Sequence, residues 1–104
     1  MQFLASISLD LTRRSEVERA LPAETARVRE LLQSGLMNAL YIPEGTGAPA
    51  SLWCVFSGDS RESVERVLVS LPLYPYMRAE LTQLRSLEPP NWQTLTIRLP
   101  ARST

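Results

Sequence analysis

Residues 71 to 77 read LPLYPYM, a stretch that combines two prolines with two tyrosines. Each proline fixes its own φ angle, lacks an N–H donor and pushes the preceding residue toward extended geometry, so no helix can run through this segment. An apolar pattern of helical spacing precedes it, and an alternating pattern follows it. We therefore predict a rigid aromatic connector between a helix and a strand, with rings that can line a pocket or seal a contact between subunits.

The patterns on either side of the connector define the C-terminal half of the fold. Upstream, the spacing predicts a helix that begins after Asp59 or Ser60 as its N-cap and ends at Pro72. The apolar face of this helix consists of Val64, Val67, Leu68 and Leu71. Downstream, residues 77 to 84 alternate between apolar and polar side chains and predict a strand.

The N-terminal half begins with a strand and a helix. Residues 2 to 9 alternate with the period of a strand. A helix is expected from about Ser15 to Gly35, with acidic residues near its start. Pro22 leaves two alternatives open: it begins the main helix in its first turn, or it marks a kink between a short opening turn and a longer helix.

A hairpin completes the pattern of elements. Residues 36 to 42 and 51 to 57 are apolar enough for two antiparallel strands, and residues 43 to 49 between them are rich in proline and glycine. The resulting order is strand, helix, strand, strand, helix, strand. It predicts an α+β ferredoxin-like βαββαβ fold, with a four-stranded antiparallel sheet and two helices on one face.

The same patterns predict one domain and a partner. Residues 1 to 87 form the ferredoxin-like domain, and residues 88 to 104 form a C-terminal tail of strand character. We expect the tail to pack on a neighbouring subunit, with a flexible terminus as the alternative. The two hairpin strands are apolar on both sides, so the sheet face away from the helices should be covered by a second copy of the chain.

The charge and composition exclude several classes of function. The chain has 104 residues, 11 basic residues that are all arginine, and 11 acidic residues, which give a net charge of zero. Without a basic patch, nucleic acid is not an expected partner. Histidine and lysine are absent from the sequence, which excludes Ser-His-Asp and Cys-His nucleophile systems and Schiff-base catalysis by lysine. Any acid or base must therefore be a carboxyl, a tyrosine, the single thiol or a chain terminus.

The single cysteine and the hydropathy pattern narrow the setting. One cysteine allows neither an internal disulfide nor a metal site of four thiolates within the chain, and no metal or other cofactor is expected. Residues 1 to 14 lack the pattern of a signal peptide, and no apolar run approaches membrane-spanning length. We expect a cytoplasmic protein without a membrane partner.

The connector resembles the Leu-Pro-Leu-Phe-Pro-Tyr-Met segment of muconolactone delta-isomerases. Further similarity lies at Glu24, at residues 33 to 35 and at residues 55 to 56, and the resemblance covers about residues 1 to 84. It implies a ferredoxin-like protein that forms homo-oligomers, a dimer at least and up to a decamer, and needs no cofactor. It also implies a reaction that moves a double bond in a lactone by proton transfer, with Glu24 as the base.

The chain departs from the family pattern in the second strand. The family's histidine and arginine fall at Ala39 and Ile42, and its tryptophan falls at Tyr41. This departure favours a divergent isomerase or cyclase for a lactone-like or polyketide-like molecule that is bulkier and less acidic than muconolactone.

Two residues are the catalytic candidates. Glu24 can act as the general base, and the alternative is a helix acid that only interacts with the helix dipole. The Tyr41 hydroxyl can donate to an enolate oxygen, and the alternative is strand packing with the hydroxyl at the rim. Cys54 is expected to behave as a small buried hydrophobic residue, because no histidine or lysine is present to stabilise its thiolate.

Five further residues are candidates for substrate binding. Asn38 can orient a carbonyl or satisfy backbone groups, and Arg78 can bind an anion or form a surface ion pair. Aromatic rings that can wall a pocket, or serve as core and interface anchors instead, belong to Trp53, Tyr74 and Tyr76.

Two other functions stay open at this point. One is a cofactor-free oxygenase of the dimeric barrel type, which would act on a phenol and consume oxygen. The other is a binding or assembly protein without catalytic activity, which the apolar residues at Ala39 and Ile42 would favour. Similarity of fold alone does not choose among these functions.

Overall fold

The computed structural model describes residues 1–45 and 50–87, and the predicted tail from residue 88 to residue 104 lies outside the described residues. The described part confirms the ferredoxin-like α+β fold. Its elements are β1 (Gln2–Leu9), the 3-10 turn η1 (Leu11–Arg13), α1 (Arg14–Ser34), β2 (Met37–Tyr41), β3 (Ser51–Ser57), α2 (Arg61–Val69), the 3-10 turn η2 (Tyr74–Tyr76) and β4 (Met77–Leu84).

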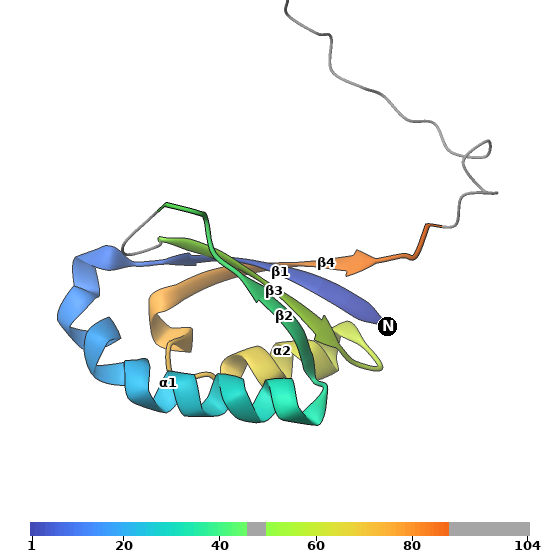
Figure 1. Cartoon of the computed structure of the whole chain (residues 1–104), viewed down its shortest axis with the longest axis horizontal. Helices are drawn as coiled ribbons and strands as arrows, with labels where there is room; N and C mark the ends of the chain where they lie inside the picture. Colours follow the sequence, from blue (N-terminus) through green and yellow to red (C-terminus); the bar gives the residue numbers. More distant parts are fainter. Residues whose placement is uncertain (46–49, 88–104) are drawn as a thin grey trace, which may run out of the picture.

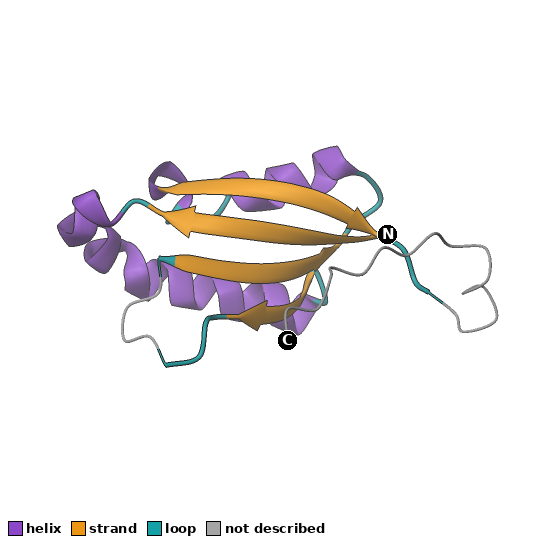
Figure 2. Ribbon diagram, turned by 90° about the horizontal axis from the view of Figure 1, so that it is seen from above, coloured by secondary structure: helices purple, strands orange, loops and turns teal. Residues whose placement is uncertain are grey.

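The four strands form one antiparallel sheet in the order β2-β3-β1-β4. Both helices lie on the same face of this sheet (Figure 1), and Figure 2 looks onto the opposite face, which no described helix covers. The register places Phe3 opposite Phe56 and Ile7 opposite Leu52. Because side chains alternate along a strand, these four residues all point toward the helices. An irregularity in the register of β2 lies between Met37 and Ala39.

Helix α1 is continuous and contains Pro22. Proline provides no N–H for the carbonyl of Glu18, so the helix loses one hydrogen bond there and can bend. Figure 1 shows the first turns of α1 descending at one end of the sheet before the rest of the helix runs beneath it. The predicted end is confirmed: Gly35 has a φ of 80°, and its N–H donates to the carbonyl of Leu32 at 3.3 Å. Glycine adopts this left-handed geometry without strain.

Helix α2 begins as predicted and ends earlier than predicted. Ser60 and Ser63 form a reciprocal capping box at its start, and the helix ends at Val69 rather than at Pro72. The connector then continues as the turn η2, in which the N–H of Tyr74 donates to the carbonyl of Leu71 at 2.9 Å. The prolines therefore allow one short 3-10 turn while they exclude an α-helix.

The core lies between the helices and the sheet. Its largest fully buried side chains are Phe3, Phe56, Leu31, Met37 and Val64. The buried and partly buried residues of β1, β3 and both helices form one cluster. Among the described residues, no helix combines the length and the apolar character needed to cross a membrane.

Candidate active site

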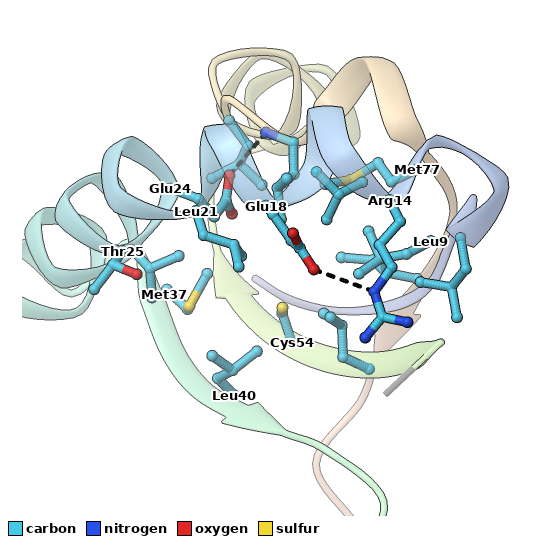
Figure 3. A pocket seen from close by; sticks show the side chains of 17 residues that line it. Leu9, Arg14, Glu18, Leu21, Glu24, Thr25, Met37, Leu40, Cys54 and Met77 are labelled. Atoms are coloured by element: carbon cyan, nitrogen blue, oxygen red, sulfur yellow. Dashed lines mark hydrogen bonds and ion pairs between the residues drawn. The ribbon is translucent and has the colours of Figure 1, made fainter. Parts of the chain in front are cut away.

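A cavity of about 450 Å³ opens between the sheet and the N-terminal half of α1. Figure 3 shows it from close by. Its lining is mainly apolar, and among the described residues its polar or ionisable side chains are Arg14, Glu18, Glu24, Thr25 and Cys54. A mostly apolar cavity with few polar groups is typical of sites that bind small molecules. The cavity is therefore the candidate site.

Helix α1 provides one whole wall of the cavity. Along the helix, the lining residues recur every three or four positions and are Arg14, Val17, Glu18, Leu21, Glu24, Thr25 and Val28. This spacing places them on one face of a helix. The acidic side chain at Glu24 thus faces a mainly apolar cavity and is half-buried there.

The carboxylate of Glu24 is held by the connector. Its Oε1 accepts a hydrogen bond of 2.9 Å from the backbone N–H of Leu73 (Figure 3). Burial raises the pKa of Glu24 above its ordinary value of 4.5, and the hydrogen bond from Leu73 opposes this shift. The connector therefore contributes to the site through its backbone, because the N–H of Leu73 positions the carboxylate of Glu24.

Cys54 lies in the sheet wall of the cavity. The side chain is buried, at 2% exposure. Burial, together with the negative charge of Glu24, raises the pKa of this thiol to about 12. The thiol is therefore protonated at neutral pH, as expected for a buried cysteine without a cationic partner.

Arg14 and Glu18 form an ion pair in the cavity lining, with 3.1 Å between Arg14 Nε and Glu18 Oε1. Their side chains are 69% and 63% exposed, which places the pair where the cavity meets solvent. Neither residue is among the site candidates predicted from the sequence. The pattern that could have identified them is a pair of opposite charges four residues apart, on the same helix face as Leu21 and Thr25.

Tyr41, Trp53 and Arg78 do not line the cavity. Tyr41 lies opposite Trp53 in the pairing of β2 with β3, and Arg78 lies opposite Ser8 in the pairing of β4 with β1. Because Trp53 alternates with Cys54 along β3, its side chain points to the face of the sheet away from the helices. The structure therefore separates these three candidates from Glu24 by the thickness of the sheet.

Asn38 also lies outside the cavity lining. Its Oδ1 accepts hydrogen bonds from Ser57 Oγ at 2.7 Å and Gln2 Nε2 at 3.3 Å, and its Nδ2 donates to the carbonyl of Gly35 at 3.3 Å. Of the two alternatives for this residue, the described contacts favour the structural one, in which it joins the start of β2 to its neighbours.

The tyrosines of the connector do not line the cavity either. The guanidinium of Arg13 lies 4.7 Å from the centre of the Tyr76 ring, and the carbonyl of Tyr76 accepts a hydrogen bond of 2.8 Å from the N–H of Asp10. Tyr74 is 41% exposed. Tyr76 thus ties the connector to the end of β1, which helps to fix the position of Leu73 relative to Glu24.

The arrangement suits proton transfer within an apolar enclosure. It contains a half-buried carboxyl with a raised pKa, and Thr25 and Arg14 as hydrogen-bond donors in the lining. Among the residues that the structure describes, no cluster of three or more His, Cys, Asp or Glu side chains can hold a metal ion.

Comparisons with known proteins agree with this fold. The chain matches the family model described as muconolactone delta-isomerase over residues 1–88. A crystal structure of muconolactone isomerase at 3.3 Å resolution is similar with a TM-score of 0.70 and 23% identity, over 86% of this chain and 93% of that chain. No curated protein sequence matches the chain.

A second solved structure is more distant. It is the 5-chloro-2-hydroxyhydroquinone dehydrochlorinase of Burkholderia phenoliruptrix in complex with 2,5-dihydroxybenzoquinone. Its TM-score is 0.59 at 13% identity, over 82% of this chain and 94% of that chain. At this identity the similarity concerns the fold.

Proposed function

This chain belongs to the muconolactone delta-isomerase family, and we propose that it is a cofactor-independent isomerase or cyclase. Its substrate in this proposal is a lactone-like or polyketide-like small molecule, bound in the cavity beside Glu24. The family supports the reaction class, and the apolar lining of about 450 Å³ supports a compact ring-bearing substrate.

In the proposed isomerisation, the Glu24 carboxylate takes a proton from a carbon next to a carbonyl group. The electron pair of the broken C–H bond enters the conjugated system, and negative charge develops on the carbonyl oxygen. The Glu24 carboxylic acid then returns the proton to another carbon, so the double bond has moved and no atom is gained or lost. The apolar side chains around Glu24 shield the intermediate from part of the solvent during this exchange.

The environment of Glu24 is the observation that carries the proposal. Its carboxylate is half-buried in an apolar cavity, and among the described residues its one hydrogen bond comes from the Leu73 N–H to Oε1. Oε2 is therefore available to a ligand. A raised pKa makes a carboxylate a stronger base and brings it closer to the pH at which the protein works.

The developing oxygen charge needs a donor. Thr25 belongs to the cavity lining and is the donor in this proposal. Tyr41 and Asn38, the candidates for this role from the sequence, would have to reach a ligand from outside the cavity lining. The proposed mechanism gives them no role within one chain.

The substitution Glu24→Gln tests the base. Glutamine keeps an oxygen that can accept the Leu73 N–H, and it cannot take a proton. With muconolactone and larger lactones as substrates, kcat should fall by about 100-fold or more, since positioned general bases contribute factors of this order. Glu30→Gln, on the same helix and outside the cavity lining, should retain wild-type turnover. Folded Glu24→Gln protein with unchanged turnover would remove Glu24 from the mechanism.

The pH dependence of the rate provides a second test of the same residue. The active form is the carboxylate, so kcat/KM should rise with pH through the pKa of Glu24. Burial shifts this pKa upward, so the midpoint should lie above the ordinary value of 4.5. Any residual activity of Glu24→Gln should lack this rise. A midpoint at or below 4.5 in the wild type would contradict a buried base.

We also propose that a second copy of the chain covers the open face of the sheet. Trp53 is 37% exposed and Tyr41 is 59% exposed, although both are large aromatic residues. Light scattering should therefore give a mass of at least twice 11.7 kDa. Tyr41→Glu should reduce the mass, whereas Tyr74→Glu, a matched exposed tyrosine on the connector, should not. A wild-type mass of one chain would overturn this part of the proposal.

A further inference from the structure

We propose that Arg14 and Glu18 form a charge-selective mouth of the cavity, at which Arg14 binds an anionic end of the ligand. The inference rests on the proposed function of the cavity and adds the residue pair that sets its preference for ligand charge. The ligand is a small molecule with an apolar ring body and one carboxylate or other oxyanion at the end that faces solvent.

The position of the pair supports this role. Arg14, Glu18, Leu21 and Thr25 lie on the same face of α1, and all four line the cavity. Figure 3 shows the Arg14 and Glu18 side chains meeting on one side of the cavity, whereas the Glu24 carboxylate turns toward the opposite side. A ligand that places its reacting carbon at Glu24 would therefore extend its other end toward Arg14.

The guanidinium of Arg14 has donors to spare. Its Nε bonds to Glu18 Oε1, and among the described residues this is its one hydrogen bond. Both terminal nitrogens therefore remain for a ligand. Because a guanidinium is planar and carries five N–H groups, these two nitrogens can hold the two oxygens of a carboxylate side by side.

Arg14 is also the one cation among the described residues that line the cavity. The remaining lining is apolar apart from Glu18, Glu24, Thr25 and Cys54, so a ligand anion has no alternative cationic partner there. The expectation of a less acidic substrate rests on Ala39 and Ile42, two positions of the second strand at which this chain has no cation. Arg14 supplies a cation from a different element, at the mouth.

Glu18 sets how strongly the mouth attracts an anion. It holds Arg14 in the lining and offsets its charge. The pair is mostly exposed, and exposed ion pairs of this kind contribute little to stability, so a ligand oxyanion can share or replace Glu18 at small cost. Removing the charge of Glu18 should therefore strengthen anion binding, and removing the charge of Arg14 should weaken it.

Two fluorescent probes with the same aromatic skeleton test the inference. 8-Anilinonaphthalene-1-sulfonate carries one sulfonate, and N-phenyl-1-naphthylamine is its uncharged counterpart. Both can be titrated into the full chain at low salt, where surface charges are least screened. The ratio of the two dissociation constants isolates the contribution of the anion from that of the apolar rings.

The expected changes have opposite signs in the two variants. Arg14→Gln should weaken binding of the sulfonate probe by roughly three- to fivefold, and Glu18→Gln should strengthen it by a similar factor. The uncharged probe should change by less than about twofold in both, which would also show that the cavity is intact. Arg19→Gln removes a charge from the same helix outside the cavity lining and should leave the ratio unchanged.

Three outcomes would overturn the inference. They are an unchanged ratio in Arg14→Gln, an equal loss in Arg19→Gln, and a wild-type protein that does not bind the sulfonate probe. In the double variant Arg14→Gln with Glu18→Gln, the gain from Glu18→Gln should shrink, because the freed guanidinium is no longer present. These binding results do not depend on turnover, so they separate this inference from the role of Glu24 as a base.

Discussion

The space between the helices and the sheet has two halves that differ in packing, although the same two strands form the floor of both. In one half, Phe3 of β1 lies opposite Phe56 of β3, and both are at most 1% exposed. In the other half, Ile7 lies opposite Leu52, and both line the cavity. We call these the packed half and the cavity half.

The helices account for the difference. Val64 and Leu68 of α2 and Leu31 of α1 are buried in the packed half. In the cavity half, α1 contributes the turns that precede Pro22, and Leu21 in these turns is 44% exposed. Figure 1 shows these turns at the opposite end of the sheet from β1's first residues. Side chains therefore fill the space between helices and sheet at one end of the molecule and leave room for a ligand at the other.

The largest expected effect comes from removing one leucine from each half. Leu31→Ala deletes a side chain that is 1% exposed and should destabilise the fold by about 2–5 kcal/mol. Leu21→Ala, on the same helix at 44% exposure, should cost less than about 1 kcal/mol. Urea unfolding followed by circular dichroism measures both. Equal losses would mean that the cavity half is packed as tightly as the other.

Adding a methylene group sharpens the same comparison. Val64→Leu inserts volume at a position that is 1% exposed and should cost about 1–3 kcal/mol. Val28→Leu adds the same group to a side chain that lines the cavity, where space is available, and should change stability by less than about 1 kcal/mol. A loss at Val28 as large as that at Val64 would contradict an open cavity. Thermal unfolding of the two variants side by side decides this.

Much of the fold follows from the sequence because its signals are local. The alternation of residues 2 to 9 and 77 to 84 predicted β1 and β4, and Gly35 marked the end of α1. The sequence predicted that α2 ends at Pro72, which is later than its observed end at Val69. The reason is that Leu71 continues the apolar spacing after the helix has ended. The Leu71 side chain is buried in the core, although Leu71 belongs to the connector and not to the helix.

The candidate site was only partly predictable. Glu24 lies in the cavity because an acid on the apolar face of a helix has to face the interior. The sequence could not tell which side of β3 faces the helices, since Trp53 and Val55 on one side are as apolar as Cys54 and Phe56 on the other. Trp53 was therefore proposed as a cavity wall and lies on the opposite face.

The smallest expected effect is a change in the reactivity of Cys54 when the charge of Glu24 is removed. Iodoacetamide should modify the single cysteine of the native protein slowly at pH 8, because a thiol with a pKa of about 12 is roughly one part in ten thousand thiolate there. The charge of Glu24 contributes to that pKa, so Glu24→Gln should speed the modification by roughly two- to fivefold. Glu30→Gln, away from the cavity, should leave the rate unchanged. Intact mass measured over time gives these rates.

Whether Glu24→Gln speeds or slows the modification of Cys54 shows whether iodoacetamide reaches this thiol in the native or in the unfolded protein. The folded pKa of Glu24 is raised, so the folded protein binds its proton more readily than the unfolded chain and loses stability as pH rises above 4.5. Glu24→Gln removes that cost and should be the more stable protein at pH 8. If modification required unfolding, the variant would therefore react more slowly than the wild type. Faster modification means that the reagent reaches Cys54 in the native cavity, as a ligand would, and slower modification would show that the cavity half is closed to a molecule of that size.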